Sequence, residues 1–245
     1  MRRSISIVLW VVAFLVTVLL AFFQRTTGPS YPKRGAVVVP GGQEIQYRLP
    51  RSNNGRETIR VTVPAPEPAP RAILSWRRFP TNEDYSEISM IRNADGDFEA
   101  EIPHQPAAGK VEYRVYFENS SGMTSIPGDE TVVARFRASV PAGILIPHIL
   151  TMFLSMLVST RALLEVLRPA APRAAGLILA AMALLVVGGL MLGPMVQKAA
   201  FGAYWTGWPV GHDLTDNKTL IACVAWLPAA IIALRRASTR LAVVA

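Results

Sequence analysis

The chain has 245 residues and a mass of 26.7 kDa, with 51% hydrophobic and 17% charged residues and a mean hydropathy of +0.31. This composition is too apolar for an ordinary soluble domain, so membrane insertion is the first expectation. The 17 glycines show no period, and Cys223 is the single cysteine, which excludes collagen-like and disulfide-scaffold classes.

The net charge of +8 is unevenly distributed along the chain. Residues 24–140 contain 15 Lys and Arg against 14 Asp and Glu, whereas the rest of the chain contains 10 against 3. Arginines next to long apolar runs are typical of the cytoplasmic ends of membrane helices. A nucleic-acid partner is therefore not expected. The flanking arginines are Arg2, Arg3, Arg161, Arg168, Arg173, Arg235, Arg236 and Arg240.

The first apolar run, Ile5–Phe23, is uncharged. At 1.5 Å per residue it measures about 28 Å, enough to cross the hydrocarbon core. The preceding Met-Arg-Arg-Ser resembles the start of a cleaved signal peptide. However, the apolar run is longer than the apolar region of most signal peptides, and no small-x-small cleavage site follows it. We therefore predict that residues 1–24 form a retained signal-anchor helix.

Three further apolar runs predict a three-helix transmembrane bundle within residues 141–245. The runs are Gly143–Thr160, Ala174–Val196 and Thr219–Leu234. Arg161 and Glu165 are spaced to pair at the water boundary of the run Gly143–Thr160. With four spans, the arginines place both termini in the cytoplasm and residues 25–140 and the loop 197–218 outside it. In a bacterium this is an inner-membrane protein with a periplasmic domain.

Small residues lie along the third predicted span. Gly176, Ala180, Gly189 and Gly193 would let another backbone approach closely, which promotes helix association in lipid. The alternative is that Ala and Gly are simply common in membrane helices.

Alternating apolar and polar residues replace continuous apolarity between the first two spans, which predicts an antiparallel β-sandwich over residues 25–140. In Val111–Phe117, for example, every second residue is apolar. The candidate strands are Ala36–Val39, Glu44–Leu49, Thr58–Val63, Ala72–Trp76, Glu87–Ile91, Phe98–Ile102, Val111–Glu118 and Thr131–Ala138.

The segments Ile73–Arg77, Glu87–Met90, Asp95–Pro103 and Gly109–Phe117, ending at Asn119-Ser-Ser-Gly122, resemble strands of immunoglobulin-like and fibronectin-like extracellular modules. The resemblance covers about 70 residues without the cysteine pair of antibody domains. It implies a fold and a binding or spacing role, with no catalytic residues.

The outer loop combines aromatic and polar side chains. We expect them to form an interfacial aromatic belt and a cap for the last helix, with Lys198 and Lys218 near lipid phosphates. The residues concerned are Tyr204, Trp205, Trp208, Asp213, Asp216 and Asn217.

The order Tyr-Trp-x-x-Trp-Pro in the same loop resembles the tryptophan-rich haem-handling segment of cytochrome c assembly membrane proteins. Such a role would need axial ligands, for which His148 and His212 are the candidates, with haem b as cofactor. Alternatively, His148, Met152 and Met156 follow one helical face, a soft ligand set suited to Cu(I). The simpler interpretation is that the methionines fill gaps in the helix packing and that His148 hydrogen-bonds a backbone carbonyl. No cofactor is therefore predicted.

The sequence lacks GxSxG, HExxH, P-loop and CxxC motifs. We therefore favour a non-catalytic accessory, scaffolding or assembly subunit that contacts other inner-membrane proteins and a periplasmic partner.

Overall fold

The computed structural model describes residues 2–39, 42–53, 55–66, 71–119, 122–168 and 173–244. It divides into a helical unit, Met1–Arg25 with Val140–Ala245, and a β unit, Thr26–Ser139. The proline-rich turn at residues 169–172 and the side chains of Arg2, Arg3, Arg236 and Arg240 lie outside the described part.

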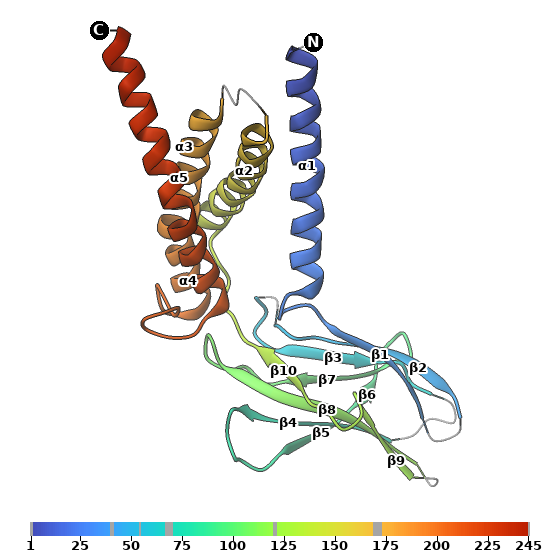
Figure 1. Cartoon of the computed structure of the whole chain (residues 1–245). Helices are drawn as coiled ribbons and strands as arrows, with labels where there is room; N and C mark the ends of the chain where they lie inside the picture. Colours follow the sequence, from blue (N-terminus) through green and yellow to red (C-terminus); the bar gives the residue numbers. More distant parts are fainter. Residues whose placement is uncertain are drawn as a thin grey trace. The chain divides into compact units, whose positions relative to one another are not determined.

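The helical unit contains α1 (Arg2–Thr27), α2 (Ala142–Val166), α3 (Ala174–Leu185) and α5 (Leu214–Val244) (Figure 1). Helix α3 continues through a π-helix, η1 (Val186–Leu192), into α4 (Gly193–Phe201). Four described segments are long and apolar enough to cross a membrane. They are Ser4–Thr27, Ala142–Val166, Ala174–Phe201 and Leu214–Arg235.

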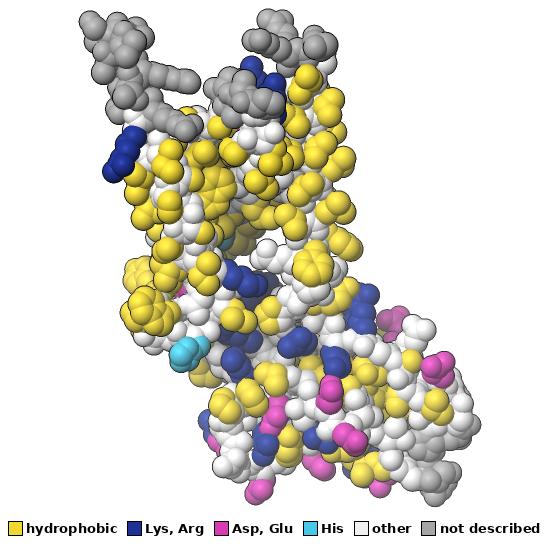
Figure 2. Space-filling view, in the orientation of Figure 1, with side chains coloured by type: hydrophobic (Ala, Val, Ile, Leu, Met, Phe, Trp, Pro, Cys, Tyr) yellow, Lys and Arg dark blue, Asp and Glu magenta, His cyan; other side chains and the backbone are white. Residues whose placement is uncertain are grey.

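In the helical unit, α3 packs between α2 and α5. The outer surfaces of these helices expose large apolar side chains such as Leu154, Leu163, Val224 and Ile232. Figure 2 shows this apolar surface in yellow along the helices. An exposed apolar surface of this extent is unfavourable in water and fits a hydrocarbon environment.

The described residues of the β unit form ten strands in three antiparallel sheets. The first pairs β1 with β2, and the second has the order β3-β7-β6. The third has the order β10-β8-β4-β5, with β9 also paired to β8. The strands are β1 (Lys33–Val38), β2 (Glu44–Leu49), β3 (Ile59–Val63), β4 (Arg71–Phe79), β5 (Ser86–Ser89), β6 (Ile91–Arg92), β7 (Phe98–Ile102), β8 (Lys110–Asn119), β9 (Gly122–Ile126) and β10 (Val132–Arg135).

The core of the β unit lies between the buried faces of these sheets. Val111, Tyr113, Val115 and Phe117 of β8 are all fully buried, which confirms the predicted alternation. Phe117 meets Phe98 of β7 with ring centroids 6.1 Å apart, so the two larger sheets contribute to one core. Burial of alternate apolar residues explains why these segments form strands.

Several local features differ from the sequence prediction. The predicted strand Glu87–Ile91 is divided into β5 and β6, which belong to different sheets. Strand β9 was not predicted, because Gly122-Met-Thr-Ser-Ile126 has no clear alternation and begins at a glycine with φ +140°. The third span does not end at Val196 but continues to Phe201, where Gly202 adopts φ +86° and its N–H bonds to the carbonyl of Lys198. A left-handed glycine is a common helix terminator.

Candidate functional site

The outer loop is held together by one carboxylate. Oδ2 of Asp216, in the first turn of α5, accepts hydrogen bonds from the backbone N–H of Thr206 at 2.7 Å and of Gly207 at 3.1 Å. The Thr206 hydroxyl lies 3.3 Å from the same oxygen and accepts a bond from Nε2 of Gln197 at 2.7 Å. Asp216 is only 8% exposed, so its charge is used to fold the loop back onto α5.

The neighbouring polar residues complete this connection. Oδ1 of Asn217 accepts the N–H of Trp208 at 2.6 Å, and Oδ1 of Asp213 accepts the N–H of Thr215 at 2.9 Å. Asp213 therefore caps the helix, while Asp216 and Asn217 bind the loop backbone. A Cβ added at Gly207 would lie 2.6 Å from the Cβ of Asp216, so this close approach requires glycine.

The aromatic residues of the loop remain largely on its surface. Tyr204 and Trp208 are 60% and 66% exposed. Trp205 donates its indole N–H to the carbonyl of Trp208 at 3.1 Å, and the ammonium of Lys198 lies 5.5 Å from the centre of the Tyr204 ring. The loop thus presents aromatic rings outward while its polar groups bond internally.

His148 is bonded within the helical unit. Its Nδ1 lies 2.9 Å from the carbonyl oxygen of Gly188, inside the π-helix. Because a carbonyl only accepts, Nδ1 of His148 is the donor in this bond. His212 is exposed in the outer loop, and no described contact joins it to His148. Among the described residues, no three His, Cys, Asp or Glu side chains cluster as a metal site.

Methionines of the proposed copper set occupy ordinary packing positions. Met152 and Met156 are half-buried, and the sulfur of Met152 would lie 3.0 Å from a Cβ added at Gly188. The main-chain carbonyl of Met156 accepts the hydroxyl of Thr160 at 2.9 Å.

The small residues of the third span fall into two groups. A Cβ at Gly189 would lie 2.7 Å from Cγ2 of Thr219 on α5, and one at Gly193 would lie 3.8 Å from Cε1 of His148 on α2. These glycines lie at contacts inside the helical unit. By contrast, Gly176 has no described atom within 4 Å of its Cβ position, and Ala180 is exposed.

A buried ion pair on α2 differs from the sequence expectation. Nη2 of Arg161 lies 2.7 Å from Oε2 of Glu165, but both side chains are fully buried instead of meeting water at a boundary. Arg168 supplies a second cation, with Nη1 3.1 Å from Oε1 of Glu165. The guanidinium of Arg161 also lies 5.6 Å from the ring centre of Trp10 on α1. The spacing of Arg161 and Glu165 predicted the ion pair, but no sequence pattern predicted that the pair would be buried.

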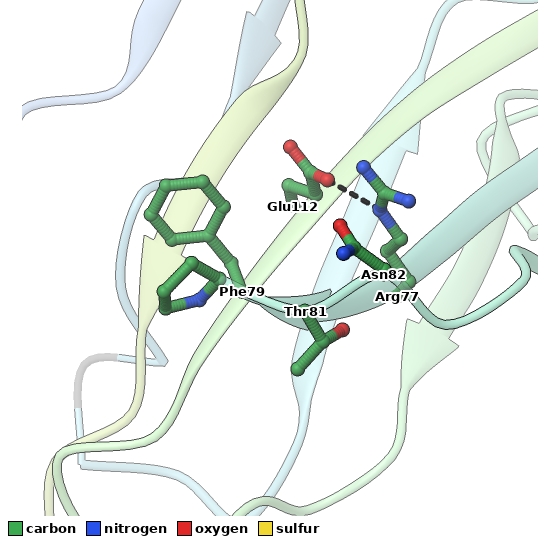
Figure 3. Close-up of a pocket in the computed structure, with 6 residues that line it drawn as sticks. Arg77, Phe79, Thr81, Asn82 and Glu112 are labelled. Carbon is green, nitrogen blue, oxygen red and sulfur yellow. Dashed lines mark hydrogen bonds and ion pairs between the residues drawn. The ribbon is translucent and has the colours of Figure 1, made fainter.

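A groove in the β unit was not predicted from the sequence. It has a volume of about 340 Å³ and adjoins the cross-strand pair formed by Arg77 of β4 and Glu112 of β8 (Figure 3). Nε of Arg77 donates to Oε1 of Glu112 at 2.5 Å. The groove is lined by Arg77, Phe79, Pro80, Thr81, Asn82 and Glu112.

The carboxylate of this groove is fully engaged. Besides Arg77, Glu112 accepts hydrogen bonds from the hydroxyls of Tyr85 at 3.2 Å and Thr131 at 3.1 Å. Burial alone would raise the pKa of Glu112, but these donors outweigh it and lower that pKa below its ordinary value. A charged, fully bonded carboxylate is a poor general acid or base at neutral pH, so the groove is better suited to binding than to catalysis.

Comparison with known proteins identifies no relative. No protein family matches this chain, and no curated protein matches it. Among solved structures, the "Crystal structure of Br derivative BhCBM56" matches at 13% identity, over 44% of this chain and 95% of that one, with a TM-score of 0.23. A score this low does not establish a shared fold.

Proposed function

We propose that this protein is a non-catalytic accessory or assembly subunit of a membrane complex, anchored by four helices and presenting its β unit outside the cytoplasm to a protein partner. The proposal rests on one observation: the polar side chains of the loop and of the groove form hydrogen bonds within the fold. Asp213, Asp216 and Asn217 bond loop and helix N–H groups, and Glu112 bonds three donors within the β unit. These side chains stabilise the fold, which leaves the protein's surfaces as the functional elements.

The proposed orientation follows from the arginines at the ends of the apolar segments. Arg168 and Arg173 lie just beyond two of the membrane-length segments and Arg235 is the last residue of a third, at ends that would share one side of the membrane. The positive-inside rule assigns that side to the cytoplasm. In a bacterium, the β unit and the loop at 197–218 would then be periplasmic, beyond the inner membrane.

An immunoglobulin-like character of the β unit is part of the same proposal. The antiparallel strands and the aromatic core shared by β7 and β8 support it. Modules of this architecture commonly serve as binding or spacing domains, and the fold itself implies no reaction.

Affinity capture from native membranes in mild detergent tests this proposal. The full chain should recover a defined membrane-protein partner in constant ratio. A variant with residues 36–138 replaced by a flexible linker should insert into the membrane but lose that partner. Recovery of the full chain as a lone monomer would contradict the accessory role. Retention of the partner by the variant would contradict the role of the β unit.

A haem or copper role remains a second proposal because of the geometry at His148. A metal-bound histidine usually donates its other ring N–H to a carbonyl or carboxylate, as Nδ1 of His148 does to Gly188. Absorption spectroscopy and metal analysis of the purified full chain test it. A Soret band or bound copper that disappears in His148→Ala would support this proposal, and a chain without either would exclude it.

A further inference from the structure

Charge is strongly polarised within the β unit. Residues 26–60 together with 135–137 contain eight Lys and Arg against two Asp and Glu, whereas residues 61–134 contain six against twelve. The near-neutral total therefore conceals a basic region and an acidic region.

Four arginines of the basic region lie on the hairpin of β1 and β2 and on the two segments that follow β2 and β10. Arg34 of β1 and Arg48 of β2 are direct cross-strand partners, and both are exposed. The carbonyl of Arg51 accepts the N–H of Arg135 at 3.1 Å, which joins the loop after β2 to β10. Arg137 lies two residues beyond the end of β10 and is exposed. We call Arg34, Arg48, Arg51 and Arg137 the basic edge.

The backbone under the basic edge is held in place by Asn53, which is 4% exposed. Its Oδ1 accepts the N–H of Arg137 at 3.0 Å, and its Nδ2 donates to the carbonyl of Arg137 at 2.9 Å. Nδ2 also donates to the carbonyl of Arg56. Asn53 thus ties the backbone at Arg137 to the loop that follows β2.

Within the described part of the chain, no acidic side chain forms an ion pair with the basic edge. Lys33 pairs with Glu130 and Arg60 with Glu101, but none of the four arginines forms an ion pair with a described residue. Like charges directly opposite in a sheet, as at Arg34 and Arg48, destabilise it. Such a cluster is best explained by an anion from outside the chain.

Chain connectivity limits how far the basic edge can lie from the membrane helices. Arg34 follows the end of α1 by seven residues, and Arg137 precedes the start of α2 by five. At 3.3–3.6 Å per extended residue these tethers reach at most about 25 Å and 18 Å. A membrane surface is therefore always within reach, whereas an acidic protein would have to be recruited.

We propose that the basic edge binds the phosphate groups of anionic phospholipids on the outer surface of the membrane. Each arginine near such a surface increases the ratio of docked to free β unit by about fivefold. Binding would restrict the β unit through both of its chain ends. The inference rests on the membrane anchorage proposed above but requires no protein partner.

Hydrogen exchange of the full chain in lipid nanodiscs tests this proposal. One preparation contains phosphatidylcholine alone and the other equal parts of phosphatidylcholine and phosphatidylglycerol. Amides of residues 31–39 and 44–53 should exchange at least about tenfold more slowly in the anionic discs, because the contributions of the four arginines multiply. About 0.5 M NaCl should remove the difference in the unmodified chain, because the Debye length is then about 4 Å.

Two triple variants make the test specific. Arg34→Gln, Arg48→Gln and Arg137→Gln together should abolish the slower exchange. Exposed arginines elsewhere provide the matched control, and Arg60→Gln, Arg71→Gln and Arg78→Gln together should retain it.

Equal exchange in the two disc types, or the same loss in both triple variants, would overturn the lipid proposal. It would leave an acidic protein as the occupant of the basic edge. A chain that does not remain in the nanodisc would instead contradict the membrane anchorage itself.

Discussion

Substitution of Asp216 by Ala tests whether the outer loop depends on a single carboxylate. The change removes the acceptor of two backbone N–H groups, at 2.7 and 3.1 Å, and of the Thr206 hydroxyl at 3.3 Å. A buried donor left without an acceptor costs about 1–3 kcal/mol, and water can reach part of this loop. We therefore expect the free energy of loop opening to fall by about 3 kcal/mol.

The assay is hydrogen exchange of the full chain in nanodiscs, read on peptides covering residues 203–213. A loss of about 3 kcal/mol accelerates exchange by about 150-fold. Asn217→Ala removes one hydrogen bond, from the N–H of Trp208, and should accelerate exchange by less than tenfold. Gly207→Ala disturbs the same contact from the loop side, so combining it with Asp216→Ala should add little. Unchanged exchange in Asp216→Ala, or full additivity with Gly207→Ala, would refute this reasoning.

Three further predictions concern other parts of the fold. Glu112→Gln should lower the free energy of unfolding of the β unit by about 2–3 kcal/mol, because Glu112 is 7% exposed and ion-paired. Glu101→Gln, at an exposed ion pair, should lower it by less than about 1 kcal/mol. Hydrogen exchange of β8 amides measures both effects, and equal effects would contradict the stabilising role of the buried pair. The lowered pKa of Glu112 means that its contribution is present above its ordinary value of 4.5 and is lost as the pH falls through its folded value. The stability difference between the unmodified chain and Glu112→Gln should therefore shrink below about pH 4.5, and a constant difference would be inconsistent with this mechanism. In the helical unit, Gly189→Leu should lower the melting temperature in detergent, because a Cβ at Gly189 would lie 2.7 Å from Thr219. Gly176→Leu should leave the melting temperature unchanged, since no described atom lies within 4 Å of its Cβ position. A larger loss in Gly176→Leu than in Gly189→Leu would disprove the packing of Gly189 against α5.

Much of the architecture follows from patterns that the sequence contains directly. The apolar runs gave the membrane-length helices, because a spanning helix satisfies its own backbone and needs only an apolar surface. Alternation in Val111–Phe117 gave β8, because one side of each strand faces the core. Both signals are local and depend on few neighbours.

Features that depend on tertiary contacts could not be predicted in the same way. The π-helix at Val186–Leu192 involves a bond between Gly188 and His148, 40 residues away. Asp216 and Asn217 were predicted as candidate caps of the last helix, but they lie inside α5 and bind the loop backbone. The burial of Arg161 and Glu165 results from tertiary packing around α2, which the i,i+4 spacing of the two residues cannot predict.

Site-directed cysteine labelling most directly tests the account's central claim, that four spans place the β unit and the outer loop on the side opposite both termini. In a chain carrying Cys223→Ala, single cysteines at the exposed positions Ser89, Val210 and Leu167 would be treated with a membrane-impermeant maleimide in intact cells. We predict labelling of Ser89→Cys and Val210→Cys without permeabilisation, and of Leu167→Cys only after it. Labelling of Leu167→Cys in intact cells, with Ser89→Cys protected, would contradict the account.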